Sequence, residues 1–106
     1  MNALTTKLAG VSFSDHQQNI QLFGYPAELG IGEYELVREP ENPHDPFAVR
    51  VCFGRFCLGY LPKNVARIVG PLMDAGKNLV AKFVSLNRSP YHDSVGLTVK
   101  IIELTT

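Results

Sequence analysis

Polar and apolar side chains alternate along several short stretches of the chain. The run Glu33–Arg38 alternates in this way, which is typical of a β-strand that buries one face. Two further alternating runs, Leu79–Leu86 and Val95–Leu104, predict the last two strands of the chain. The polar segment Asn87–Ser94 between them is expected to be a loop.

A tight hairpin is predicted in the middle of the chain. Two strand-like runs, Phe47–Phe53 and Phe56–Tyr60, are separated only by Gly54-Arg55. Glycine at the first of two loop positions suits a type II′ turn, because that position needs a positive φ. The resulting register sets Cys52 opposite Cys57, close enough to crosslink. We expect both to be free thiols, since a reducing cytosol keeps cysteines reduced.

The N-terminal part predicts one strand and one short helix. The loosely alternating run Leu8–Phe13 predicts the first strand. Ser14 is a candidate N-cap for a helix over Asp15–Phe23, because its hydroxyl can accept a hydrogen bond from a free amide at the helix start. The short polar ends, Met1–Thr5 and Thr105–Thr106, are expected to be frayed.

A longer helix is predicted after the hairpin. Pro62 stands where this helix can begin, since its fixed φ and missing N–H cost nothing there. Gly76 is well placed to end it, and Pro71 predicts a kink or a break near Gly70. Between these signals, apolar residues recur at the spacing of one helical face: Val65, Ile68, Val69, Leu72 and Met73.

Together these patterns predict a mainly β chain of the α+β class. Six strands with one main helix inserted between them favour a small, partly open six-stranded barrel. The segment Glu39–Pro46 has three prolines in the seven positions from Pro40 to Pro46, so it has to be an irregular loop. The 106 residues are expected to form a single domain, 1–106, with its core at about 7–104.

Composition and charge narrow the range of functions. Hydrophobic residues make up 45% of the chain, a normal globular share. Ten basic and ten acidic side chains cancel, which argues against tight coating of DNA or RNA but allows recognition of a small feature such as a strand end. The apolar runs are too short to cross a bilayer and no secretory signal is visible, so we expect a soluble cytoplasmic protein without membrane contact.

No catalytic or metal-binding pattern stands out. The two cysteines and three histidines lack the paired spacing of a zinc site, and the chain contains no P-loop. His44 and Asp45 are neighbours in the loop, but acid–base catalysis needs a third orienting group and a pocket, of which the sequence gives no sign. We therefore expect a binding module that uses neither metal nor cofactor, and not an enzyme.

Two sequence blocks resemble the HIRAN domain family. The segment Leu36–Val51 contains Arg-Glu-Pro-Glu-Asn-Pro-His-Asp, which is similar to the family loop R-[ED]-P-x-N-P-x-D between two strands. Gly59–Lys63, followed by an alanine-containing helix, resembles the second block, and Ala9-Gly10-Val11 resembles the opening strand. The resemblance covers about Lys7–Leu104 and implies an OB-like barrel.

The resemblance also implies a function. HIRAN domains stand at the front of fork-remodelling helicases of the SWI/SNF type, where they hold the 3′-hydroxyl end of single-stranded DNA, and they also occur alone in bacteria and phages. This chain, without an ATPase motif, resembles the stand-alone kind. The implied role is recognition of single-stranded DNA 3′ ends in repair, replication or phage-related DNA metabolism, with other proteins of DNA metabolism as possible partners.

Four positions match the family's binding site most directly. Asp45 matches the position whose carboxylate receives the terminal 3′-hydroxyl, and Asn42 matches a neighbouring position that helps to hold the end nucleotide. Tyr60 and Lys63 match positions near the terminal backbone, the former a histidine in the helicases. An ionised carboxylate suits a hydroxyl and repels a terminal phosphate, because it can only accept hydrogen bonds.

Two further positions depart from the family pattern. DNA-binding relatives have an Arg-Tyr-Tyr run after the first strand, where this chain has Ser12-Phe13-Ser14, so Phe13 is the stacking candidate and the basic contact is missing. His44 replaces an aromatic loop residue. These departures and the neutral charge keep a second hypothesis open, a non-catalytic protein-interaction adaptor on the same barrel.

Each of these residues also has a purely structural interpretation. Asn42 and Asp45 can cap their own loop backbone between the prolines. Tyr60 and Phe13 can be core rings, and Lys63 can be a solvated lysine.

Overall fold

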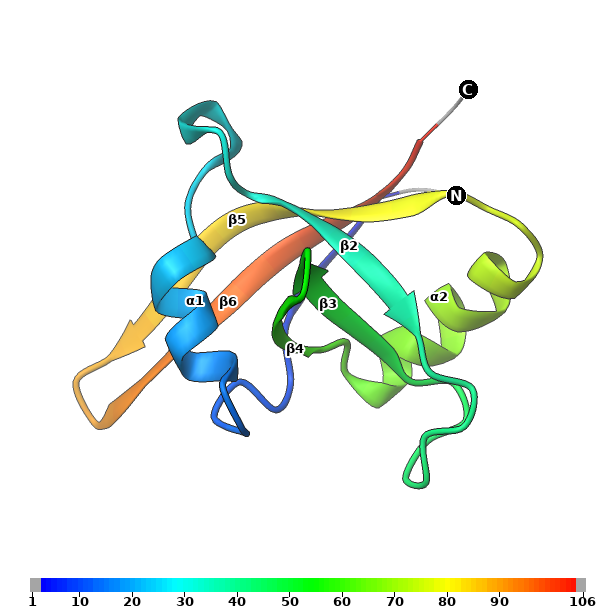
Figure 1. The fold of residues 1–106 in the computed structure, drawn as a ribbon, viewed down its shortest axis with the longest axis horizontal. Coiled ribbons are helices and arrows are strands. Elements are labelled where there is room, and N and C mark those ends of the chain that lie inside the picture. The colour runs from blue at the N-terminus through cyan, green and yellow to red at the C-terminus, as the bar shows by residue number, and fades with distance from the viewer. Residues whose placement is uncertain (1–2, 105–106) are drawn as a thin grey trace.

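Six antiparallel strands form one sheet in the computed structural model, which describes residues 3–104 (Figure 1). The strands pair in the order β1-β6-β5-β2-β3-β4. Within the described range the chain also forms two α-helices and a short 3₁₀ turn, η1. In chain order the elements are β1 (Leu4–Lys7), α1 (His16–Phe23), η1 (Ala27–Leu29), β2 (Glu33–Arg38), β3 (Val49–Phe53), β4 (Phe56–Tyr60), α2 (Lys63–Asp74), β5 (Leu79–Ser89) and β6 (His92–Glu103).

A short backbone pairing closes this sheet into a barrel. After β1, the amide of Leu8 still donates to the Leu97 carbonyl of β6 at 2.9 Å. Ala9 then exchanges two hydrogen bonds with Tyr60 at the end of β4, at 2.7 and 2.9 Å. Because β1 and β4 are the two edges of the sheet, this bridge joins the edges at one point. The predicted mainly β, OB-like, partly open six-stranded barrel is confirmed.

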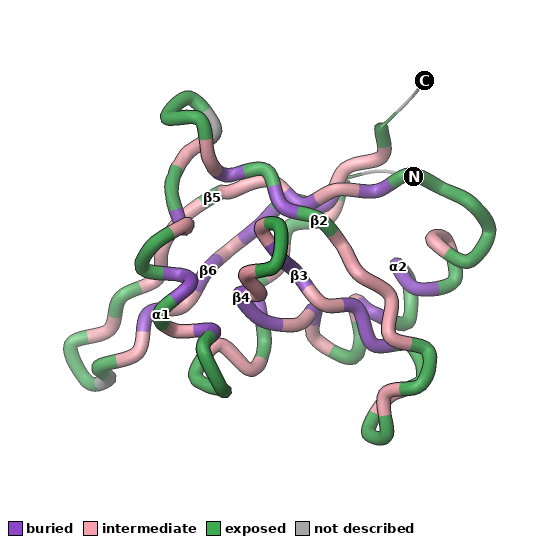
Figure 2. Tube along the Cα trace, in the orientation of Figure 1, coloured by how far each residue is buried: buried purple, intermediate pink, exposed green. Residues whose placement is uncertain are grey.

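The core lies inside this barrel and beneath both helices. Alternation along β6 buries Leu97, Val99 and Ile101 completely. Helix α1 contributes Ile20 and α2 contributes Val69, neither with any exposed surface. Figure 2 shows the buried positions running through the sheet and along one side of each helix. One apolar cluster therefore connects the sheet with both helices.

The first strand lies earlier in the chain than predicted. Strand β1 covers Leu4–Lys7, where it pairs with β6, whereas the segment Leu8–Phe13 adds only the Leu8 bond to β6 and the Ala9 bridge to β4. The chain turns away from the sheet at Gly10, which has a left-handed φ of 65°. Thr5, expected to be frayed, is thus part of the barrel, while residues 1–2 and 105–106 lie outside the described residues.

The short helix is confirmed, but its predicted cap is wrong. Helix α1 falls within the predicted range Asp15–Phe23. The N-cap residue is Asp15, which makes no side-chain hydrogen bond to the helix. Ser14 precedes the cap position and has a left-handed φ of 51°.

The C-terminal hairpin is longer than predicted. Strands β5 and β6 remain paired as far as Ser89 and His92, so most of the expected loop Asn87–Ser94 is strand and the turn lies at Pro90-Tyr91. Strand β2 pairs only with residues 80–82 of β5, and the outer half of the hairpin extends past that pairing (Figure 1). Outside the core a strand needs backbone partners but no apolar face, so the hydrophobic pattern does not reveal it.

Helix α2 is continuous and ends as predicted. It begins directly after Pro62 and passes through Pro71 without the predicted break. The amides of Gly76 and Lys77 bond back to carbonyls of the last turn, both at 3.0 Å, and Gly76 has a φ of 89°. This is a Schellman motif, which confirms Gly76 as the terminating glycine.

Helix α2 presents most of its predicted apolar face to the core. Val69 is buried, and Val65, Leu72 and Met73 are partly buried against the core cluster. Ile68, which was also predicted on this face, is 53% exposed. The small residues Ala66 and Gly70 are buried beside Val69, and a Cβ at Gly70 would lie only 3.1 Å from the carbonyl oxygen of Phe47.

The β3–β4 hairpin has the predicted register and carries a disulfide. Cys52 is paired with Cys57 across the turn, and Gly54 has the positive φ, 58°, that a type II′ turn needs. The two cysteines are bonded, with Cα atoms 4.0 Å apart. The expectation of free thiols is therefore wrong for this structure.

Replacing Gly59 with alanine is expected to destabilise the barrel at the point where it closes. The new Cβ would lie 2.8 Å from the carbonyl oxygen of Ala9, which accepts one of the two bridging hydrogen bonds. Overpacking of this kind costs about 1–3 kcal/mol of unfolding free energy, measurable by urea denaturation. The control is Gly96→Ala, where the nearest atom is 3.4 Å away. Equal losses in the two variants would contradict the closure role.

Candidate nucleic-acid interface

The proline-rich loop between β2 and β3 is held by its own side chains. Asn42 Oδ1 accepts hydrogen bonds from the amides of His44 and Asp45, at 2.8 and 3.1 Å. Asp45 Oδ1 in turn accepts the amide of Phe47 at 2.9 Å. The structural interpretation of both Asx residues is thus correct. Within residues 3–104, Asp45 Oδ2 makes no hydrogen bond or ion pair.

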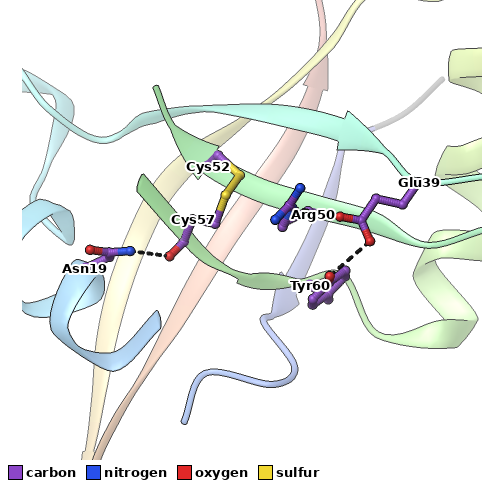
Figure 3. Close-up of a disulfide and its surroundings, with 6 residues drawn as sticks. All are labelled: Asn19, Glu39, Arg50, Cys52, Cys57 and Tyr60. Atoms are coloured by element: carbon purple, nitrogen blue, oxygen red, sulfur yellow. Dashed lines mark hydrogen bonds and ion pairs between the residues drawn. A yellow bond between two sulfur atoms is a disulfide. The ribbon is translucent and has the colours of Figure 1, made fainter. Parts of the chain in front are cut away.

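Glu39, the first residue after β2, connects this loop to the β3–β4 hairpin. Its Oε1 accepts hydrogen bonds from Asn42 Nδ2 and from the Tyr60 hydroxyl, both at 3.0 Å. Its Oε2 lies 2.8 Å from Arg50 Nε, an ion pair in which the N–H does not point at the oxygen. Figure 3 shows Glu39 and Tyr60 converging beside Arg50. One carboxylate therefore holds side chains from the loop, β3 and β4.

The Tyr60 hydroxyl is held in its protonated form. Burial raises the pKa of Tyr60 above its ordinary value, and the hydrogen bond and charge of Glu39 raise it further, against a smaller lowering by Arg50. Because a carboxylate can only accept, the Tyr60 hydroxyl has to donate to Glu39. Its oxygen then has only acceptor capacity left for a ligand.

Phe13 and Tyr60 both lie against Gly10. A Cβ at Gly10 would be 3.1 Å from the Phe13 ring and 3.8 Å from the Tyr60 ring. His16 fixes this turn, since its Nδ1 lies 2.8 Å from the Gly10 carbonyl oxygen and its ring meets Tyr60 edge-on at 6.1 Å. Phe13 is 68% exposed, so its interpretation as a core ring is wrong. The two rings form a small, partly exposed aromatic surface.

Lys63 and His44 stand apart from these contacts. Both are exposed, and neither side chain makes a hydrogen bond or ion pair with the described residues. Lys63 opens α2, three residues after Tyr60. The amides of Lys63 and Asn64 have no carbonyl partner within the helix and can meet an anion, whereas those of Val65 and Ala66 bond to the Pro62 carbonyl. Hydrogen bonds through Glu39 therefore link Tyr60 with Asn42 and Asp45, and Phe13 lies against the same Gly10 as Tyr60. Lys63 is placed near them only through the chain.

A shallow depression lies beside the loop, lined by residues 38–43 and Tyr60. Three N–H donors of Arg38 make hydrogen bonds within the protein: two to the Asp74 carboxylate at 3.0 Å and one to the Ala48 carbonyl at 3.2 Å. The other polar side-chain groups along the depression, apart from the amide of Asn42, are the acceptors of Glu39, Glu41 and Tyr60. The depression is thus rich in hydrogen-bond acceptors.

Sequence reasoning missed Glu39 and His16. Glu39 belongs to the Arg-Glu-Pro run of the loop motif, but its bond to Tyr60 joins residues 21 positions apart. His16 is buried against Gly10 and Tyr60, and its position in a short helix gives no sign of that contact. Both partnerships depend on β4 being folded against the loop and α1.

The barrel, its self-capped loop and its exposed rings define a small binding module of the OB-like class. Residues 2–102 match the model of the HIRAN domain family, and the chain belongs to that family. HIRAN domains are nucleic-acid-binding modules.

Two solved structures share the fold. The HIRAN domain of human HLTF matches with a TM-score of 0.69 and 15% identity, over 96% of this chain and 74% of that one. A protein from Lactobacillus plantarum matches with a TM-score of 0.69 and 22% identity, over 97% of this chain and 98% of that one.

Two plant proteins are related in sequence. A Fanconi-associated nuclease 1 homolog from Arabidopsis thaliana is 38% identical over 73 residues, which is 68% of this chain and 7% of the relative. The homolog from Oryza sativa subsp. japonica is 40% identical over 43 residues, or 37% of this chain and 4% of the relative. The chain thus spans less than a tenth of the curated relatives that it matches.

Neither α1 nor α2, the two α-helices of residues 3–104, has the length and apolar character that a membrane-spanning helix needs. Nor do three or more His, Cys, Asp or Glu side chains in that part gather in a way that could hold a metal ion.

Replacing Asn42 with alanine is expected to loosen the loop. The change removes the acceptor of two amides and the donor to Glu39, so the unfolding free energy should fall by about 1–2 kcal/mol. Thermal and urea unfolding measure this loss. His44→Ala, on the same loop but without side-chain contacts, should stay within about 0.5 kcal/mol of the parent. A loss in His44→Ala as large as that in Asn42→Ala would contradict the capping role.

Proposed function

We propose that this HIRAN domain binds the 3′-hydroxyl end of single-stranded DNA and acts as a non-catalytic module. The observation that carries the proposal is the free acceptor oxygen of Asp45 on a loop that Asn42 and Glu39 tie to Tyr60. A terminal hydroxyl is a donor that such an oxygen can receive, whereas a terminal phosphate is an anion that it repels.

The neighbouring groups suit the rest of an end nucleotide. The exposed ring of Phe13 and the adjoining ring of Tyr60 offer faces on which a base can stack, an interaction of about 1–3 kcal/mol per base. Lys63 and the first amides of α2 offer positive charge to a backbone phosphate. His44 lies on the same loop as Asp45 and is exposed for a weaker contact with the ligand.

Charge limits how strongly the domain binds. A formal net charge of zero supplies little of the counterion release that drives non-specific binding. We therefore expect modest affinity at physiological salt and a preference set by the strand end. The name of the plant relatives is that of a nuclease, which supports a role in DNA repair or replication. The matched part is too small a fraction of those proteins to carry their activity over.

A free 3′ end should bind at least about tenfold more tightly than a 3′-phosphate, because two anions close together in a partly buried site repel by more than about 1.4 kcal/mol. Fluorescence anisotropy with labelled single strands that differ only at this end measures the ratio. Asp45→Asn should abolish most of this preference for the free 3′ end. The new amide can still accept the hydrogen bond from the Phe47 amide, but it presents an uncharged donor group to the strand end. A ratio unchanged in Asp45→Asn would contradict the role of Asp45.

Lys63→Ala should weaken binding of both ends by a similar factor and lower the salt dependence by about one phosphate contact. The same titrations at several salt concentrations measure this. Lys100→Ala removes the same charge from an exposed position on β6 and is the matched control. Equal effects of the two substitutions would show that only net charge matters.

A second function is favoured by the exposed apolar side chains of Phe13 and Ile68, 68% and 53% exposed, together with the neutral charge. These features suit a protein-interaction adaptor on the same barrel. Failure to bind either strand end at high protein concentration would favour the adaptor.

A further inference from the structure

The side chain of Glu39 contacts residues from three different segments of the chain. Its side chain is 20% exposed and contacts Tyr60 on β4, Asn42 on the loop and Arg50 on β3. Its main chain is bonded as well, with the amide donating to Ala48 at 2.9 Å. Glu41, two residues later, lines the same depression but is exposed and makes no hydrogen bond or ion pair with residues 3–104. The two carboxylates carry equal charge and differ in their contacts.

Hydrogen-bond polarity in this cluster is fixed by Glu39. A carboxylate accepts only, so both Tyr60 and Asn42 have to turn their donors toward it. The amide of Asn42 then presents its oxygen to the N–H groups of His44 and Asp45, which holds the Asp45 backbone. The Tyr60 oxygen, whose O–H points at Glu39, keeps only lone pairs for a ligand. Such an oxygen receives a sugar hydroxyl or a base N–H and makes no hydrogen bond to a phosphate oxygen.

We propose that Glu39 is a positioning and specificity-determining residue: by holding Tyr60 as a committed donor, it makes the end site accept hydroxyl groups and reject phosphate. The inference rests on the proposed function and deepens it, because it assigns part of the discrimination to a residue that acts through Tyr60 rather than by touching the strand end. Asp45 supplies the direct acceptor, and Glu39 gives Tyr60 the same polarity.

Glu39→Gln is the substitution that tests this polarity. The new amide keeps the size of the side chain, and its carbonyl oxygen is drawn to the Arg50 guanidinium, which offers only donors. The NH₂ group then stands where Oε1 was and faces both the Tyr60 oxygen and Asn42 Nδ2. Tyr60 becomes an acceptor from it and turns its own O–H toward a ligand, while Asn42 loses one acceptor. A 3′-phosphate should gain a hydrogen bond, while a 3′-hydroxyl should lose its acceptor.

The readout is the ratio of affinities for 3′-hydroxyl and 3′-phosphate strands, measured by anisotropy. Glu39→Gln should lower this ratio about fivefold, the effect of about one hydrogen bond. Glu41→Gln removes the same charge from the same depression without touching Tyr60, and its ratio should stay within about twofold of the parent, as expected for an exposed charge. In a Tyr60→Phe background, Glu39→Gln should change the ratio much less than in the parent, because the hydroxyl through which it mainly acts is absent and only its contact with Asn42 remains.

A second measurement needs no DNA. Glu39 raises the pKa of Tyr60 through its hydrogen bond and charge, so Glu39→Gln should lower that pKa, as followed by the ultraviolet absorbance of the phenolate with Tyr60→Phe as the reference. Urea unfolding of each variant ensures that the ratios compare folded proteins. A merely structural role for Glu39 would change stability and leave the ratio alone.

The outcomes separate the two proposals. If the parent discriminates between the ends and Glu39→Gln does so equally, the inference about Glu39 is overturned while the proposed function stands. An equal loss in Glu41→Gln, or an undiminished effect of Glu39→Gln in the Tyr60→Phe background, overturns it as well, because charge alone would then explain the change. A parent domain that binds both ends equally, or neither, overturns the proposed function and this inference together.

Discussion

The two hydrogen bonds between Ala9 and Tyr60 are the contact on which the rest of the molecule depends. They join the outer edges of a six-stranded sheet at a single residue pair, and without them β1 and β4 would be unpaired edges at this end. The same pair places the turn that follows Ala9 beside the end of β4. Both the Phe13 and the Tyr60 ring lie close to Gly10, so closure of the barrel also places the two aromatic candidates beside the same turn.

A second constraint acts on the other side of Tyr60. Glu39 gathers the tyrosine hydroxyl, the Asn42 amide and the Arg50 guanidinium around one carboxylate, and each of these comes from a different segment. In the proposed function, recognition at this place would depend on hydrogen-bond polarity more than on net charge. That is consistent with a chain whose basic and acidic residues balance.

Helix α2 supplies the acidic partner of Arg38, a cation that lines the depression. Its Gly70 packs against the carbonyl of Phe47, and its Asp74 forms a two-bond ion pair with Arg38 at 3.0 Å. A side chain at Gly70 would crowd the Phe47 carbonyl, because its Cβ would lie 3.1 Å from that oxygen. Arg38, fixed between Asp74 and the Ala48 carbonyl, is a structural cation, and the acceptors of the depression remain available to a ligand.

Local signals in the sequence determined the elements that local chemistry controls. Strand β2, the β3–β4 hairpin with its turn at Gly54, helix α1 and the end of α2 at Gly76 follow from alternation, glycine placement and helical spacing, all of which act over a few residues. The loop motif around Asn42 likewise indicated the HIRAN family from the sequence alone. The positions of β1 and of the outer β5–β6 hairpin did not follow, because their backbone bonds to partners far along the chain require no hydrophobic pattern.

The candidate site divides in the same way. Asn42 and Asp45 cap amides two or three residues away, and the sequence alone indicates such turns. The bond between Glu39 and Tyr60 and the approach of the Tyr60 ring to Gly10 are tertiary outcomes, because their partners are far apart in the chain. The register of the hairpin could be predicted, and it set the cysteines face to face. The sequence did not show which carboxylate would accept the hydrogen bond of the Tyr60 hydroxyl. Only the tertiary structure decided that, because the closed barrel brings β4 against the loop.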